Sequence, residues 1–253
     1  MAERKTEYIF AEAATAFVLI AVLGLQELRR EDPVCKVSEV ESVRAKAEAN
    51  KVEEQEQENA EKKQETQTED VIADGQYPIM GQSSVTTEQM VSYFQSSGKA
   101  YPAESLAKGG ADSIETFCRI YVEEAQAEGV RPEVAFVQTM KETGFLQYGG
   151  DASIEQFNFA GLGTTGGGVP GNSYPDVRTG VRAQIQHLKA YATADPLAQE
   201  CVDDRYEYVQ KGSAPYVQWL GQKENPQGAG WATAENYGYS IVEMISHLKG
   251  KNS

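Results

Sequence analysis

The residue best placed to do chemistry in this 253-residue sequence is Glu142, which stands at the expected C-terminal end of an apolar helix. That helix is predicted to begin at Pro132, a residue suited to the first helical turn, and to stop at Gly144. Burial in an apolar wall and the negative end of the helix dipole both oppose ionisation of a carboxyl group there. Such a group keeps its proton near neutral pH, as a general acid for a glycosidic oxygen must. The alternative is a glutamate that simply turns to solvent in the last helical turn.

The elements that would position Glu142 are helices. Thr86 or Thr87 can cap a short helix that ends near Phe94. Residues 134–140 are apolar on nearly all sides, which places the Glu142 helix at the centre of the core. Apolar residues that recur every three to four positions predict three more helices: Ile114, Phe117, Cys118, Tyr121 and Ala125; Val181, Ile185, Leu188 and Ala192; and Tyr237, Ile241, Ile245 and Leu248. No two convincing alternating strands appear, so the fold class is mainly α, with irregular loops along one side of a cleft.

The composition divides the chain into three segments. Residues 1–30 are predicted to be a membrane anchor or signal segment, because the run from Ile9 to Leu25 is apolar except for Glu12 and Thr15. No small-residue cleavage site follows this run, which favours an uncleaved anchor. Residues 31–82 are expected to form an acidic, low-complexity spacer, since they offer too little apolar surface to fold. Residues 83–253 carry both tryptophans and are expected to form the catalytic domain.

Several function classes are excluded at this stage. The formal net charge of −15 and the absence of a basic cluster in the folding region argue against nucleic acid as a partner. Three cysteines and two histidines, far apart in the sequence, have no metal-ligand spacing, so we expect neither a metal nor another cofactor. Cys118 falls on an apolar helix stripe and is expected to be a buried thiol. A disulfide between Cys118 and Cys201 stays possible if the domain is exported.

Four sequence fragments resemble one known family. These are PEVAFVQTMKETG at 132–144, NFAGLG at 158–163, YPDVRTGVRAQIQHLKAY at 174–191, and the group formed by WLG at 219–221, GWA at 230–232 and NYG at 236–238. Together, and in this order, they are similar to the glucosaminidase family, glycoside hydrolase family 73. The resemblance extends over nearly all of residues 110–250. It implies a lysozyme-like helical domain that cleaves the β-1,4 bond between N-acetylglucosamine and N-acetylmuramic acid in peptidoglycan.

The resemblance also implies roles for individual residues. Glu142 corresponds to the catalytic acid at the family's helix-ending Glu-x-Gly corner, and Tyr237 matches a tyrosine that lines the same site. The candidate sugar contacts are Asn158, Phe159, Gly161 and Tyr174. Asn158 has a structural alternative as a residue that satisfies loop backbone groups, Phe159 as a core residue, and Tyr237 as a packed helix residue.

The second catalytic group is open at the level of sequence. An inverting mechanism needs a second carboxylate to activate water, whereas the 2-acetamido oxygen of the substrate can act as the nucleophile instead. Asp176 is the leading candidate, although its place before a helix also suits an N-cap. Asp151 and Glu155 are further candidates.

Three readings of the domain remain: a hydrolase, a lytic transglycosylase, and a peptidoglycan-binding module without turnover. In each of them the expected partners are glycan strands and, through the N-terminal helix, the membrane. The expected location is the cell membrane, crossed once, with the catalytic domain on the cell-wall side. The charge rule alone would leave the downstream side cytoplasmic, because Arg29 and Arg30 follow the apolar run. The extracellular placement therefore depends on the proposed substrate.

Overall fold

The computed structural model describes residues 75–250, and their fold is mainly helical as predicted. No strand longer than an isolated bridge occurs in this range. The α-helices are α2 (Thr87–Ser96), α3 (Ala103–Ala107), α4 (Ile114–Glu128), α5 (Pro132–Glu142), α6 (Val177–Ala192) and α7 (Tyr237–Leu248). Three short 3₁₀ helices complete the order: η2 (Ile154–Gln156), η3 (Tyr206–Tyr208) and η4 (Val217–Leu220).

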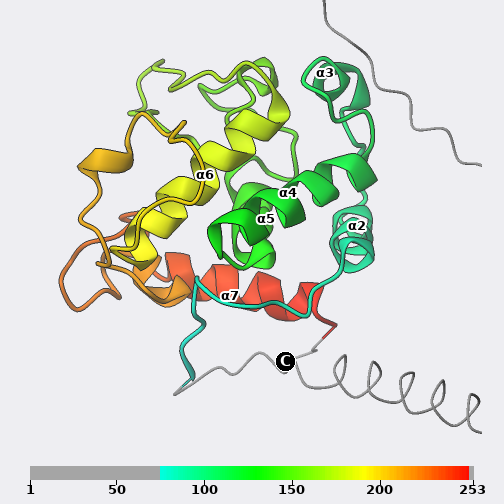
Figure 1. Cartoon of the computed structure of the whole chain (residues 1–253). Coiled ribbons are helices and arrows are strands. Elements are labelled where there is room, and N and C mark those ends of the chain that lie inside the picture. Colours follow the sequence, from blue (N-terminus) through cyan, green and yellow to red (C-terminus); the bar gives the residue numbers. More distant parts are fainter. Residues whose placement is uncertain (1–74, 251–253) are drawn as a thin grey trace, which may run out of the picture. The chain divides into compact units, whose positions relative to one another are not determined.

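Helix α5 lies at the centre of the domain. It contacts α2, α4, α6 and α7, and Figure 1 shows it enclosed by these four helices. Every residue of α5 from Pro132 to Met140 is buried, which confirms the central position expected from its apolar sequence. Fully burying a large aliphatic or aromatic side chain contributes on the order of 1.5–3 kcal/mol, so the core around α5 supplies much of the stability that holds Glu142 in place.

Helix ends follow the local chemistry of the sequence. The side chain of Thr86 accepts from the backbone N–H of Gln89 and so caps α2, which settles the choice between Thr86 and Thr87. Ser113 caps α4 in the same way. Gly129 ends α4 with φ +74°, a left-handed conformation that glycine adopts without steric cost. Helix α5 begins with Pro132 at its first turn, as expected.

The segment before α2 belongs to the core. Tyr77 and Ile79 are buried, although the sequence analysis placed both in the spacer. The backbone of Ile79 donates to Pro215 O at 3.0 Å and accepts from Arg131 N at 2.9 Å. The folded region therefore extends upstream of residue 83, and the predicted boundary omits a segment that pairs with two distant parts of the chain.

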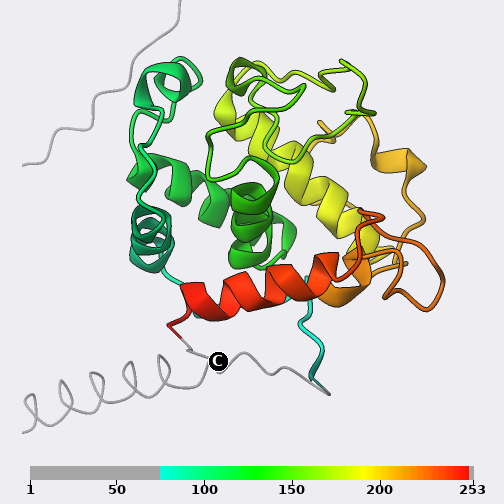
Figure 2. The same ribbon diagram turned by 180° about the vertical axis from the view of Figure 1, so that it is seen from behind.

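Helix α7 crosses the domain on one side of α5. Both views show its C-terminal end beside α2 and its N-terminal end beside η4 (Figures 1 and 2). Gly238 in the first turn of α7 explains the close approach to η4, because a Cβ at this position would lie 2.2 Å from Val217 O. This packing places Tyr237, the first residue of α7, directly over the end of α5.

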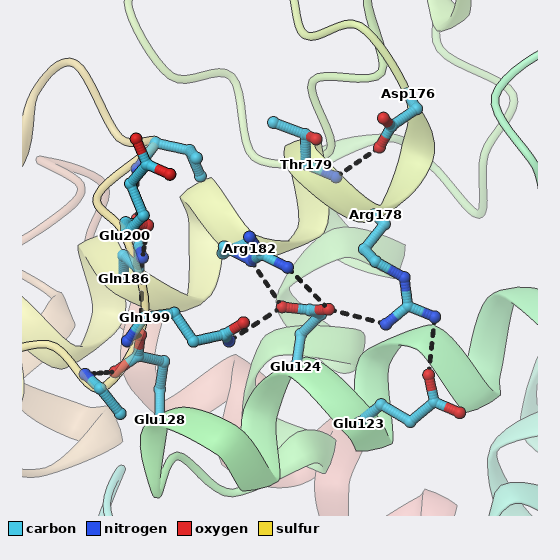
Figure 3. A network of polar contacts seen from close by, with 12 residues as sticks. Glu123, Glu124, Glu128, Asp176, Arg178, Thr179, Arg182, Gln186, Gln199 and Glu200 are labelled. Carbon is cyan, nitrogen blue, oxygen red and sulfur yellow. Dashed lines mark hydrogen bonds and ion pairs between the residues drawn. The ribbon is translucent and has the colours of Figure 1, made fainter. Parts of the chain in front are cut away.

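A network of charged side chains joins α4 to α6 (Figure 3). The buried carboxylate of Glu124 accepts from Arg178 at 2.7 Å and from Arg182 at 2.8 Å. It also accepts from the side-chain amide of Gln199 at 3.0 Å. Burial alone would raise the pKa of Glu124, but these hydrogen bonds outweigh it and hold the pKa below its ordinary value.

One turn further along α4, Glu128 binds the other end of α6. Its carboxylate accepts from Lys189 Nζ at 2.9 Å and from the backbone N–H groups of Ala198 and Gln199 at 2.9 and 3.1 Å. Burial again acts to raise the pKa, and the bonds from Ala198, Lys189 and Gln199 together lower it. The two glutamates thus fasten α6 to α4.

Two further sequence predictions concern cysteines and the membrane. Cys118 is a buried free thiol, as expected, and Cys201 is an exposed free thiol, so the possible disulfide between them does not form. Within residues 75–250 no helix is long and apolar enough to cross a membrane. The apolar run at 9–25 and most of the predicted spacer lie outside the described residues.

The α4–α6 network predicts that Glu124→Gln lowers the free energy of unfolding by about 2 kcal/mol, because two arginines lose their buried counter-charge. The matched control is Glu123→Gln, whose exposed carboxylate also pairs with Arg178; its effect should stay within about 0.5 kcal/mol. Chemical denaturation followed by circular dichroism measures both.

The same measurement has a pH dependence. The pKa of Glu124 is lower in the folded state than its ordinary value of 4.5. The contribution of Glu124 to the free energy of unfolding is therefore complete above pH 4.5 and is lost as the pH falls through the lower pKa of the folded state. Equal destabilisation by Glu123→Gln and Glu124→Gln, or a difference between them that does not shrink in acid, would show that this network does not stabilise the fold.

Candidate active site

Glu142 is the last residue of α5, and the chain reverses directly behind it. The hydroxyl of Thr143 donates to Thr139 O at 2.7 Å and accepts from Leu146 N at 2.8 Å. Gly144, Phe145 and Leu146 follow with φ of +57°, +58° and +62°. Left-handed backbone at residues other than glycine is costly and tends to collect at functional sites. This turn stops α5 at Glu142 and directs the following loop around a cleft.

The carboxyl of Glu142 is held by Tyr237. The phenolic hydroxyl of Tyr237 donates to Glu142 Oε1, and the side-chain amide of Gln138 donates to the same hydroxyl oxygen at 3.1 Å. Gln184 Nε2 in turn donates to Gln138 Oε1 at 2.9 Å. Three helices therefore contribute to one chain of donors that runs from α6 through α5 to α7 and ends on Glu142.

The far end of this chain is also fixed. Gln184 Oε1 accepts from the hydroxyls of Tyr121 and Thr139, at 2.9 Å each. Its amide nitrogen donates a second bond to Ala135 O at 3.0 Å. With its partners on both sides, Gln184 has one amide orientation, and this sets the donor direction of every bond down to Glu142.

The donor direction determines where Glu142 carries its proton. Because Oε1 accepts from Tyr237, the proton of a neutral Glu142 lies on Oε2. Burial is the largest influence on this group and raises the pKa of Glu142, while the Tyr237 hydrogen bond and the charge of Lys141 lower it in part. The pKa of Tyr237 is raised well above 10 by burial and by the adjacent carboxyl, so the phenol stays a donor. The sequence-based expectation of a carboxyl with a raised pKa is confirmed in direction.

Glu142 opens onto a cleft of about 600 Å³. As a whole residue Glu142 is exposed, because the cleft side of its side chain faces solvent, while Tyr237 and the end of α5 enclose its carboxyl from behind. Loops form the other walls, and they bring Tyr148, Asp151, Gly161, Thr164 and Trp231 to the same cleft. The arrangement is a cleft with Glu142 at its edge and the aromatic side chains of Tyr148, Trp231 and Tyr237 in its lining.

Of the predicted sugar contacts, Gly161 is a cleft residue and Asn158 is not. Asn158 is 1% exposed, and its amide ties the loop together: Nδ2 donates to Leu162 O and Asn172 O, and Oδ1 accepts from Leu162 N at 3.0 Å. It therefore has the structural role that the sequence analysis held as its alternative. The 158–163 fragment shapes the cleft wall through its backbone.

Phe159 and Tyr174 also lie away from the cleft lining. Phe159 is 1% exposed and packs edge-on against Phe117, with ring centroids 5.1 Å apart, so it is a core residue. Tyr174 is buried, and its backbone N–H donates to Gln156 O at 2.8 Å. Neither aromatic ring borders the space in front of Glu142.

Asp151 and Asp176, the two aspartates considered for the second catalytic role, lie in different places. Asp176 caps α6 by accepting from Thr179 N at 2.7 Å and does not line the cleft. Asp151 does line it, and its Oδ2 accepts from Gly168 N at 3.1 Å. The structure thus brings Glu142, Tyr237 and Asp151 to one cleft and places Asp176 at a helix end.

Gln138 and Gln184 are the positioning residues that the sequence analysis missed. Both are completely buried amides in otherwise apolar surroundings. A signal was present, because each stands among the apolar residues of a core helix, where an uncharged polar side chain needs a buried partner. In the part of the chain that is described, no group of three or more His, Cys, Asp or Glu residues could hold a metal ion.

The Tyr237–Glu142 contact predicts the behaviour of Tyr237→Phe. Loss of the hydroxyl removes an influence that lowers the pKa of Glu142, so the pKa rises further and the alkaline limb of the rate profile moves to higher pH. Loss of a hydrogen bond to the carboxylate that forms during turnover should lower kcat roughly ten- to a hundredfold. Dye release from labelled peptidoglycan, the substrate implied by the resemblance, measures both quantities across pH.

Tyr174→Phe is the control, since Tyr174 lies outside the cleft lining. An alkaline limb that stays in place in Tyr237→Phe, or moves to lower pH, would contradict the assigned contact.

Comparison with known proteins identifies a family. The family model of glucosaminidase, mannosyl-glycoprotein endo-beta-N-acetylglucosaminidase, matches residues 118–250, a range that includes Glu142, Asp151 and Tyr237. An uncharacterized protein of Borreliella burgdorferi (strain ATCC 35210 / DSM 4680 / CIP 102532 / B31) is 30% identical over 178 residues, which cover 68% of this chain and 84% of that protein. No solved structure matches. The chain belongs to the glucosaminidase family of glycoside hydrolases.

Proposed function

We propose that this protein is a peptidoglycan hydrolase that cleaves the β-1,4 bond between N-acetylglucosamine and N-acetylmuramic acid, with Glu142 as the general acid. The observation that carries the proposal is the Tyr237–Glu142 hydrogen bond at the edge of a cleft of about 600 Å³, where burial raises the pKa of Glu142. The membership of the glucosaminidase family supports the substrate class.

The mechanism uses the two carboxyl oxygens differently. Oε2 gives its proton to the glycosidic oxygen as the bond to the sugar carbon breaks, so the departing sugar leaves as an alcohol. The negative charge that remains on Glu142 is stabilised by Tyr237, which already donates to Oε1. The bond needs no rearrangement during the reaction, because the donor chain behind Tyr237 is complete before the substrate binds.

Asp151 is the better candidate for the group that assists water. It lines the same cleft as Glu142, whereas Asp176 is engaged as the N-cap of α6. In this mechanism Asp151 accepts a proton from the water that attacks the sugar carbon from the opposite face. In the substrate-assisted alternative, the 2-acetamido oxygen attacks that carbon instead. Asp151 would then act on the acetamido nitrogen or not at all.

A lytic transglycosylase would use the same acid and would need no water-activating carboxylate. The presence of Asp151 in the cleft favours the hydrolase. A binding module without turnover has no use for a carboxyl group whose pKa is raised and whose second oxygen is left for a ligand.

We propose further that the apolar run at 9–25 anchors the protein in the cell membrane and that the catalytic domain faces the cell wall. The length of the run and the substrate support this placement. Protease treatment of intact cells should then release a fragment containing residues 75–250. Recovery of the undigested protein from intact cells, with digestion only after lysis, would show that the domain lies on the other side.

The catalytic assignment predicts that Glu142→Gln abolishes dye release from peptidoglycan. Glutamine keeps the size of the side chain and still accepts from Tyr237, so the fold should be unchanged by circular dichroism. The amide cannot transfer a proton, and general acid catalysis supplies on the order of 10²–10⁴-fold in rate.

A matched pair tests the second group in the same assay. Asp151→Asn should lower kcat at least tenfold if Asp151 activates water, and Asp176→Asn should affect stability more than rate, because asparagine also serves as an N-cap. Near-normal turnover by a folded Glu142→Gln protein would refute the acid assignment. A loss of rate confined to Asp176→Asn would transfer the water-activating role to that residue.

A further inference from the structure

A second, smaller pocket adjoins the cleft that contains Glu142. Its volume is about 190 Å³, and it shares Gly161, Thr164 and Trp231 with the larger cleft. Beyond this shared wall, its lining comes from the rest of the 160–165 loop, from His187 and Tyr191 on α6, and from Arg205 after α6. A sugar strand in the main cleft therefore passes beside an opening that can admit a group attached to it.

His187 brings a buried hydrogen-bonding group to this pocket. The side chain is almost fully buried, and its Nδ1 lies 2.6 Å from Asp203 Oδ2. A carboxylate oxygen accepts, so Nδ1 carries a proton and donates; in the tautomer that this bond selects, Nε2 is the acceptor. Nε2 has no partner within residues 75–250. The imidazole is thus oriented by Asp203 with its other nitrogen available to a ligand N–H or O–H.

Arg205 brings a cation to the rim of the same pocket. Its guanidinium group is exposed, lies 5.6 Å from the centre of the Tyr208 ring, and has no ion-pair partner among the described residues. Asp203, two positions before Arg205, is already occupied: Oδ1 accepts from the backbone N–H of Arg205 at 2.9 Å, and Oδ2 binds His187. The adjacent Asp204 is exposed and forms no ion pair with Arg205 among the described residues. An unpaired arginine is notable in a chain with a formal net charge of −15.

The walls between these polar groups are aromatic. The rings of His187 and Trp231 meet edge-on with centroids 4.9 Å apart, and those of Tyr191 and Trp231 are 6.0 Å apart. The hydroxyl of Tyr191 is turned away to donate to Gly230 O at 3.1 Å. The pocket therefore combines aromatic rings with the imidazole of His187, the guanidinium group of Arg205 and the side chains of Thr164 and Thr165.

We propose that this pocket binds the acidic peptide carried by the muramic acid residues of peptidoglycan, an inference that rests on the proposed function. A short peptide offers what the pocket needs: amide N–H groups for His187 Nε2, a carboxylate for Arg205, and small side chains for the wall formed by Trp231 and Tyr191. A further sugar ring would supply hydroxyl groups but no anion for Arg205. The smaller volume, about 190 Å³ beside about 600 Å³, also suits a side branch more than the strand itself.

The experiment measures binding without turnover. The full-length protein with Glu142→Gln is titrated by calorimetry with three soluble glycan preparations: strands that carry their peptides, the same strands after the peptide carboxylates are converted to amides, and strands from which the peptides have been removed. The last preparation exposes the lactyl carboxylate of muramic acid and so separates this source of negative charge from the peptide.

Adding Arg205→Gln should weaken binding of peptide-bearing strands roughly tenfold, the range expected for a hydrogen-bonded charge pair. Binding of the amidated strands and of the stripped strands should not change. Arg205→Lys should restore part of the loss. Arg119→Gln is the matched control, because it removes another exposed arginine, on α4, whose partner Glu123 is also exposed.

Peptide-bearing and amidated strands that bind equally well, with no effect of Arg205→Gln, would overturn the inference and leave the proposed function intact. An effect of Arg205→Gln on the stripped strands alone would identify the lactyl carboxylate as the ligand and also overturn it. Failure of the proposed function has a separate signature, since the protein with Glu142 unchanged would then release no fragments from any of the three preparations.

Discussion

The site depends on a buried chain of hydrogen bonds that runs from Gln184 through Gln138 and Tyr237 to Glu142. The three links join two pairs of helices, α6 with α5 once and α5 with α7 twice, so both pairs must be in register. A buried donor or acceptor without its partner costs about 1–3 kcal/mol, so a displacement of any one helix is opposed by the whole chain. The chain therefore acts both as a core constraint and as the device that orients the acid.

Other features of the fold keep these three helices in register. Helix α6 is fastened to α4 through Glu124 and Glu128, and α7 approaches η4 closely at Gly238. Two effects act in opposite directions on the pKa of the Glu142 carboxyl. Burial raises its pKa, and the hydrogen bond from Tyr237 limits the rise. A general acid needs this balance, because a group that never ionises cannot give up its proton.

Much of the fold could be predicted from the sequence. Five of the six α-helices in residues 75–250, all but α3, were expected from the sequence. The central place of α5 and the position of Glu142 follow from apolar spacing, from Pro132 and from the Gly144 stop, all of which are local. The roles of Asn158 and Phe159 could not be separated locally, since a buried loop asparagine and a sugar-binding one have the same neighbours in sequence. The boundary at 83 was wrong because Tyr77 and Ile79 are stabilised by residues more than 50 positions away. The link from Gln138 to Tyr237 spans 99 positions, and no local pattern encodes it.

In the proposed reaction, Glu142 protonates the oxygen of the bond that follows N-acetylglucosamine, and water completes the cleavage. The identity of the new sugar ends tests this most directly. Peptidoglycan digested with the purified full-length protein is reduced with borohydride, and the products are analysed by mass spectrometry. Reduced N-acetylglucosamine is expected at the new ends. Reduced N-acetylmuramic acid would mean that the other glycosidic bond is cut, and 1,6-anhydro-muramic acid would mean that no water enters the reaction; either result would contradict the account.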